Sequence, residues 1–167
     1  MKIGFDVSQT GAGKAGCGYF AAGLLDALSR VDGRNEYVLY PAFGDFFWEP
    51  RPKACLRPAG GHFRTGPAFR RFTSQKRFFR EPPPDFEARL GAPDIMHANN
   101  FYCPMGLSRA RLVYTLYDLS FLVEPAWTTE GNRTGCFDGV FRAATAADWI
   151  VPISSARLFS SFPCSLV

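Results

Sequence analysis

Short apolar runs alternate with segments of helical periodicity along most of this chain. Residues 2–7 predict a first strand, and further strands are expected at 36–40, 54–57, 94–98, 111–116 and 149–153. Apolar side chains at helical spacing predict an amphipathic helix that ends at Gly33, and they comprise Phe20, Leu24, Leu28 and Val31. Further helices are expected at about 67–80 and 129–147.

This alternation is typical of an α/β protein. Apolar strands separated by helices form a parallel sheet that is covered on both faces. We therefore predict an α/β fold with a Rossmann-like parallel sheet and helices on both faces, in one domain over residues 1–153. Residues 58–93 are rich in Gly, Pro and Arg and are expected to form an irregular basic insertion. Residues 154–167 are expected to be a truncated tail, in which a helix begins and is not completed.

The composition is that of a globular protein, since 47% of the 167 residues are hydrophobic and 20% are charged. Asp6 comes too early for a signal peptide, and no apolar run approaches the ~20 residues that span a membrane. We therefore expect a cytoplasmic protein that could also associate with a membrane. The spacing of the five cysteines argues against a disulfide framework and against a metal site, because no two of them form a Cys-x-x-Cys pair. They are Cys17, Cys55, Cys103, Cys136 and Cys164.

Positive charge is concentrated in one part of the chain. The net charge is +4, but the window between Glu49 and Glu81 holds nine basic residues and no acidic one. Such a field attracts anions. The phenylalanine-rich segment 63–80 within it predicts peripheral contact with a membrane or with an anionic acceptor, and a solvated surface is the alternative. Nucleic acid is not an expected partner, because no recognised binding motif accompanies the charge.

Four glycines lie between the first strand and the first helix: Gly11, Gly13, Gly16 and Gly18. A strand, a glycine loop and a helix bring a phosphate group against bare backbone at a helix N-terminus. The dinucleotide-binding fingerprint also needs an acidic residue at the end of the second strand, whereas Glu36 lies at its start. A Walker A loop is excluded because Ala15 follows Lys14. A tight turn without a ligand is the alternative.

Residues with useful chemistry gather where two predicted strands end. His97, Asn99 and Asn100 stand at the end of the strand at 94–98, and Tyr117 and Asp118 follow the strand at 111–116. In doubly wound sheets, ligands bind at the carboxyl ends of the strands. Asp118 is expected either to accept substrate hydroxyl groups or act as a base, or to cap the following turn. For His97, a structural role and a binding role explain the position equally well.

Together, these motifs resemble the N-terminal domain of the family-four glycosyltransferases, which have two facing Rossmann-like domains in the GT-B architecture. The resemblance rests on segments in the expected order: residues 2–11 (KIGFDVSQTG), 93–99 (PDIMHAN), 113–122 (VYTLYDLSFL) with Pro125, and 147–154 (ADWIVPIS). These segments span almost the whole chain.

The resemblance implies transfer of a sugar from a nucleotide-sugar donor to a glycan or lipid-linked acceptor, with retention and without a metal ion or other cofactor. It brings the glycine loop close to the donor diphosphate and places the acceptor on this domain. The expected acceptor-binding residues are His97, Asn99, Asn100, Arg70 and Arg71. Tyr117 and Asp118 stand where the family often has His-Asp, and they are the expected catalytic residues.

The resemblance also implies a second domain that carries the nucleotide site, and the chain does not include one. We therefore expect the 167 residues alone to have no transferase activity. A Rossmann-type nucleotide-binding oxidoreductase is one alternative. A non-catalytic module that binds anionic membranes or glycans is another.

Overall fold

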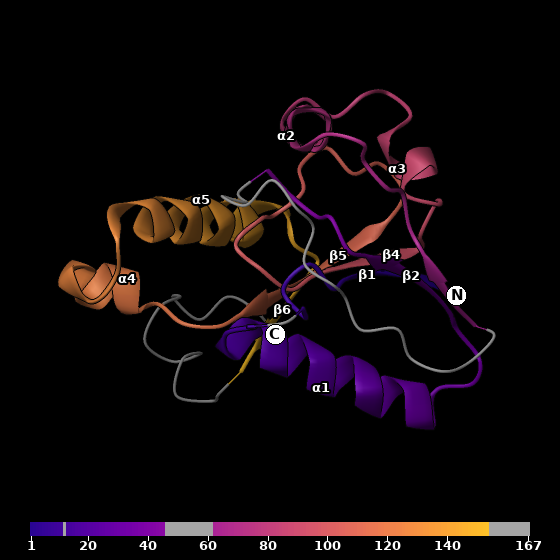
Figure 1. Ribbon diagram of the computed structural model, residues 1–167, viewed down its shortest axis with the longest axis horizontal. Coiled ribbons are helices and arrows are strands. Elements are labelled where there is room, and N and C mark those ends of the chain that lie inside the picture. The colour runs from indigo at the N-terminus through magenta and orange to yellow at the C-terminus, as the bar shows by residue number, and fades with distance from the viewer. Residues whose placement is uncertain (12, 46–61, 154–167) are drawn as a thin grey trace.

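The computed structural model describes residues 1–11, 13–45 and 62–153, which contain one six-stranded sheet (Figure 1). All strand pairs are parallel, and the order across the sheet is β3-β2-β1-β4-β5-β6. The strands cover Lys2–Asp6 (β1), Glu36–Tyr40 (β2), Phe63–Thr65 (β3), Ile95–Ala98 (β4), Arg111–Leu116 (β5) and Trp149–Pro152 (β6). The predicted α/β, Rossmann-like fold is confirmed.

The order of the strands reverses between β1 and β4. The chain first builds β1, β2 and β3 outward, then returns to the free side of β1, where Phe5 pairs with His97. At such a switch point the loops after the two adjacent strands diverge and leave a crevice at the carboxyl ends. The loops after β1 and β4 are therefore where this fold favours a ligand.

Helices cover both faces of the sheet (Figure 1). Helix α1 (Gly16–Val31) lies against one face, and α2 (Phe72–Arg80), α3 (Phe86–Arg89) and α5 (Glu130–Ala146) lie on the other. The side chains of β2 point alternately to the two faces of the sheet. Tyr37 and Leu39 pack with α1, whereas Val38 and Tyr40 belong to the core on the opposite face. A short helix, α4 (Ser120–Val123), and a 3-10 helix, η1 (Pro125–Trp127), follow β5.

Local sequence explains where α5 and α2 begin and end. The hydroxyl of Thr129 accepts a hydrogen bond from the Asn132 amide at 3.4 Å and caps α5, which confirms the helix predicted at 129–147. Helix α2 forms only the second half of the predicted 67–80 helix, because Arg71 keeps an extended backbone with φ −136° and ψ 142°. It ends at Arg80, ahead of three consecutive prolines that cannot continue a helix.

The segment predicted as an irregular insertion, 58–93, is more ordered than expected. Its described part holds β3, α2 and α3. The third strand lies at Phe63–Thr65, where Phe63 pairs with Tyr37 of β2. The strand predicted at 54–57 and the tail at 154–167 lie outside the described residues.

Three phenylalanines of the basic segment pack in or against the core. Phe78 and Phe79 are only 8% and 2% exposed, and the Phe69 ring packs against both. These three rings are therefore not free to insert into a membrane, whereas Phe72 is half-buried and Arg70 and Arg71 are exposed. Among the residues that the structure describes, no helix combines the length and apolar character needed to cross a bilayer.

Candidate ligand site at the carboxyl ends of the strands

The predicted glycine loop extends into the first turn of α1, and its glycines have two different roles. A Cβ on Gly18 of α1 would lie 1.9 Å from the carbonyl oxygen of Gln9, so this glycine lets the helix pack against the loop after β1. A Cβ on Gly13 or Gly16 would meet nothing within 4 Å. Gly13 also has a positive φ of 69°, which favours glycine. Gly13 and Gly16 therefore border open space from which a ligand can reach the backbone.

The N-terminus of α1 has the features of an anion site. Its N-cap residue, Ala15, makes no side-chain capping bond, and the first turn holds no acidic residue. The amides of a first helical turn lack partners within the helix and carry partial positive charge. Lys14 adds a cation beside this turn, with its Nζ 4.8 Å from the centre of the Tyr19 ring. The predicted diphosphate loop thus combines open backbone, a helix terminus and a nearby ammonium group.

Asp6, at the end of β1, joins the glycine loop to the loop after β4. It is 1% exposed, and its carboxylate accepts from the backbone amides of Ser8 at 2.9 Å and Asn99 at 3.2 Å. The Asn99 side chain donates back to the Asp6 carbonyl at 3.2 Å, and Asn100 donates to the Ser8 hydroxyl at 2.8 Å. Burial raises the pKa of Asp6 to about 7, although these hydrogen bonds oppose the rise. The sequence offers one signal for this role, namely an acidic residue at the end of the first strand, ahead of the glycine loop.

His97, predicted to bind the acceptor, belongs to the same buried network. Its Nε2 lies 2.9 Å from the Thr115 hydroxyl, which donates to the Asn99 side-chain oxygen at 2.9 Å. Because the hydroxyl proton is used on Asn99, the Thr115 oxygen accepts from a protonated Nε2. Burial lowers the pKa of His97 to about 4, so the ring is neutral near pH 7. The contacts of His97 are structural, and Asn99 is likewise fully engaged on both sides of its amide.

Tyr117 links the end of β5 to the start of α1 and the end of β4. Its hydroxyl lies 3.2 Å from the Cys17 carbonyl oxygen and 3.0 Å from the Asn99 carbonyl oxygen, and its single proton is shared between these two acceptors. Burial raises the pKa of Tyr117 far above its usual value, so the group acts as a hydrogen-bond donor and not as a base. Three segments predicted to form one site, namely the glycine loop, residues 97–100 and residues 117–118, therefore meet at Tyr117.

Asp118 caps the turn that follows it. One of its oxygens, Oδ1, accepts from the Ser120 amide at 2.9 Å and from the Ser120 hydroxyl at 2.6 Å. The residue is exposed, and its other carboxylate oxygen has no hydrogen bond within the part of the chain that the structure describes. A capping role and an accessible oxygen are thus both present.

The structure does not bring Arg70 and Arg71 to this site. Both precede α2 on the surface and line no part of the cavity between α2 and α5, which we name the α2–α5 pocket. This pocket of about 250 Å³ is bordered by other cations, Lys76, Arg80 and Arg142. Arg142 comes from α5, so no run of basic residues in the sequence announces it.

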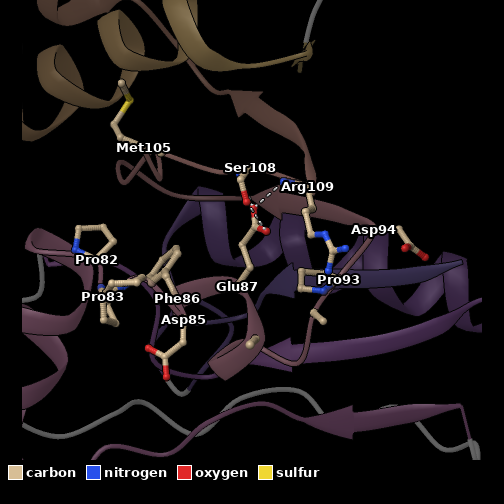
Figure 2. A pocket seen from close by; sticks show the side chains of 14 residues that line it. Pro82, Pro83, Asp85, Phe86, Glu87, Pro93, Asp94, Met105, Ser108 and Arg109 are labelled. Carbon is tan, nitrogen blue, oxygen red and sulfur yellow. Dashed lines mark hydrogen bonds between the residues drawn. The ribbon is translucent and has the colours of Figure 1, made fainter.

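A larger cavity, of about 890 Å³, reaches the opposite edge of the sheet, where β4 and β5 begin (Figure 2). Two of its acidic side chains, Glu87 and Asp94, accept hydrogen bonds from backbone amides. Glu87 accepts from the backbone amides of Ser108 at 2.7 Å and Arg109 at 3.1 Å, and Asp94 accepts from the Lys2 amide at 2.7 Å. Because these acids already have backbone donors, we assign no chemistry to this cavity.

The residues that the structure describes contain no group of three side chains that could hold a metal ion. Cys103 and Cys136 are free thiols, and Cys55 and Cys164 lie outside the described residues.

The fold and the switch point define an α/β, Rossmann-like domain with a candidate ligand site after β1 and β4. Comparison of the chain with models of known families, with curated proteins and with solved structures gives no match.

Proposed function

We propose that this chain is the acceptor-side, N-terminal domain of a GT-B glycosyltransferase. The enzyme would transfer a sugar from a nucleotide-sugar donor to a glycan or lipid-linked acceptor, with retention and without a metal ion. The observation that carries this proposal is the meeting of three loops at the switch point, where Tyr117 contacts the first turn of α1 and the end of β4. The resemblance to the family assigns all three of these loops to the donor or acceptor site.

The start of α1 is the group we expect to act on the donor. Open backbone at Gly13 and Gly16, together with the uncapped helix terminus, would donate hydrogen bonds to a diphosphate. The same groups would stabilise the charge that develops on the phosphate as it leaves the sugar. Tyr117 would hold the helix start in position through Cys17, and the accessible oxygen of Asp118 would accept an acceptor hydroxyl.

Exposed apolar side chains near the same edge of the sheet are consistent with a second domain. Trp127 is 76% exposed, and the rings of Phe137 and Phe141 stack 4.3 Å apart while remaining 46% and 49% exposed. These side chains belong to η1 and α5, and the segment carrying η1 follows the carboxyl end of β5 (Figure 1). Apolar groups that gather on a surface commonly mark an interface.

One observation favours a dinucleotide-binding oxidoreductase instead, namely the strand order, which is that of the Rossmann fold. The end of β2 argues against it. Tyr40 is followed by Pro41 and Ala42, so no carboxylate stands there for a ribose, and Glu36 is exposed at the far end of the strand. We therefore rank this function second.

Saturation-transfer NMR of the 167-residue chain with UDP-glucose, GDP-mannose and NAD distinguishes the two functions. Because the nucleotide site is expected on the second domain, we expect weak signals from the nucleotide sugars through their diphosphate, which UDP displaces, no tighter binding of NAD, and no turnover. NAD binding without nucleotide-sugar binding would favour the oxidoreductase. Turnover of a nucleotide sugar by the chain alone would contradict the need for a second domain.

Two glutamate substitutions on one helix form a matched pair for this experiment. Gly16→Glu places a carboxylate at the N-terminus of α1, and Gly23→Glu places the same charge on the exposed middle of the helix. Neither added Cβ meets an atom within 4 Å. We expect the first variant to lose diphosphate binding through charge repulsion and the second to keep it.

A further inference from the structure

The α2–α5 pocket has the shape of a small binding site whose walls are fixed by hydrogen bonds. Its floor is formed by the chain after β4, where the Tyr102 hydroxyl donates to the Phe79 carbonyl of α2 at 2.7 Å. Gln75 of α2 donates to the Gly44 carbonyl at 3.2 Å, which holds the segment after β2 beside the pocket. On the other wall, a Cβ on Gly139 would lie 1.9 Å from the Phe101 carbonyl oxygen, so α5 sits directly on the floor. A ligand would therefore meet a preorganised site.

The charges at this pocket are not balanced. Arg80 forms an ion pair with Asp45 at 3.3 Å. Lys76 and the Arg142 guanidinium border the same space, and neither pairs with a carboxylate within the described part of the chain. Cations from two helices that share a cavity repel one another, and an anion between them removes that cost.

Acceptor groups stand beside these cations. The carboxylate of Asp138 borders the pocket and has no ion pair within the described residues. The Thr134 hydroxyl also lines it and donates to the Glu130 carbonyl at 3.0 Å, which leaves its oxygen able to accept. A carboxylate repels a bare anion but accepts hydrogen bonds from hydroxyl groups. The cations would bind an anionic group, and the acceptor oxygens would bind hydroxyl groups. A phosphorylated polyol carries both kinds of group.

We infer that the α2–α5 pocket binds the phosphate monoester of a sugar-sized ligand, with Lys76 and Arg142 on the phosphate and Asp138 on a hydroxyl. This inference deepens the proposed function, because it gives the acceptor an anionic group. The volume of about 250 Å³ equals that of roughly eight water molecules and suits one phosphorylated sugar unit better than a nucleotide. The phosphate belongs either to a free sugar phosphate or to a lipid headgroup.

Calorimetric titration with inorganic phosphate and with glucose 6-phosphate tests the pocket. We expect glucose 6-phosphate to bind more tightly than phosphate, and its binding to weaken as ionic strength rises. The double variant Lys76→Gln with Arg142→Gln should weaken binding at least about tenfold. Asp138→Asn should strengthen binding of inorganic phosphate and reduce the advantage of the sugar phosphate.

A matched control uses the same two helices and the same loss of charge. Arg77→Gln with Arg133→Gln removes one cation from α2 and one from α5, but Arg77 pairs with Glu81, Arg133 with Glu130, and neither lines the pocket. This variant should bind glucose 6-phosphate within about twofold of the wild type. Thermal unfolding of both double variants verifies that each is folded. Equal losses in the two variants would overturn the assignment of the site, as would absence of binding to the wild type.

Phosphatidylcholine vesicles with and without phosphatidic acid separate the two sources of phosphate. Binding that requires phosphatidic acid and is lost in Lys76→Gln with Arg142→Gln would identify a lipid headgroup. Binding to glucose 6-phosphate alone would identify a soluble ligand. Binding of neither would contradict the inference. The outcome is independent of the proposed function, because UDP binding at the start of α1 responds to Gly16→Glu and not to the pocket variants.

Discussion

The network around Asp6 and the α2–α5 pocket both stand at the carboxyl ends of the strands, yet they treat polar groups in opposite ways. Around Asp6 the polar side chains are buried and hydrogen-bonded to one another, and the histidine ring is neutral near pH 7. In the pocket, Lys76 and Arg142 are reachable by solvent and form no ion pair within the described residues. A buried polar network that is fully satisfied fixes the position of the backbone. Cations that border a cavity attract anions. The first region therefore builds the site, and the second is available to a ligand.

In the framework formed by the Asp6 network and the adjoining glycine loop, substitution of Gly18 should have the largest effect on stability. Gly18→Ala drives a Cβ into the Gln9 carbonyl oxygen, at 1.9 Å, and we expect a loss of about 3 kcal/mol in the free energy of unfolding. Gly16→Ala, where nothing lies within 4 Å, should change it by less than about 0.5 kcal/mol. Urea denaturation measures both. Similar losses in the two variants would show that the loop glycines share one role.

The pH dependence of stability separates Asp6 from His97. The pKa of Asp6 is raised from 3.8 to about 7, so the folded protein holds the proton more tightly and loses stability as pH rises through that window. The pKa of His97 is lowered from 6.5 to about 4, so the folded protein gains stability as pH rises from 4 to 6.5. These two slopes oppose each other in the wild type.

Removing either group should expose the slope of the other. Relative to the wild type, Asp6→Asn should make stability rise more steeply with pH, and His97→Gln should make it fall, by up to about 1.4 kcal/mol per pH unit. Denaturation curves at several pH values between 4 and 7 provide the slopes. If Asp6→Asn follows the wild-type profile, then Asp6 is ionised throughout this range, and the opposition described above does not exist.

A smaller effect is expected from Tyr117, which connects the network to α1. Tyr117→Phe removes the hydrogen bonds to the Cys17 and Asn99 carbonyls and should cost about 1 kcal/mol. Hydrogen exchange should also quicken at the start of α1. Tyr19→Phe is the control, because Tyr19 lies in α1 itself and is 65% exposed. We expect this variant to have no effect. Unchanged exchange in Tyr117→Phe would mean that this hydroxyl does not hold the helix start.

The smallest effect on stability should come from the pocket. Arg142→Gln removes an exposed charge without an ion pair in the described residues, so the free energy of unfolding should change by less than about 0.5 kcal/mol. Thermal and urea denaturation measure this change. A loss comparable to that of Tyr117→Phe would make Arg142 part of the framework and remove the contrast between the two regions.

The sequence predicts a strand or helix correctly where the hydrophobic pattern of that one segment is sufficient. The strands β1, β2, β4, β5 and β6 are apolar runs, and the periodicity of α5 gave its bounds to within one residue at each end. Strand β3 was missed at its true place because it has three residues with Arg64 at its centre, and an edge strand needs no apolar run. Phe78, which lies in the core, was not recognised as an inward-facing residue of α2.

The site residues were harder to predict because their roles depend on distant partners. Asp6 contacts Asn99, 93 positions along the chain, and nothing local marks that pairing. Lys76 and Arg142 border one cavity although they come from different helices, and no basic run in the sequence indicates that they lie together. For Asp118, both the cap and the accessible oxygen could be expected, and the hydrogen bonds to Ser120 show the cap.

The most direct test of the proposed ligand site is an amide-resolved NMR titration of the isotope-labelled chain with UDP. We predict that shifts concentrate at Gly13, Gly16 and Cys17, extend to Asn100, and vanish in Gly16→Glu but not in Gly23→Glu. The amide of Ser108, at the cavity on the opposite edge of the sheet, serves as the internal reference and should not move. Shifts centred on Ser108, or no shift at saturating UDP, would contradict a diphosphate site at the start of α1.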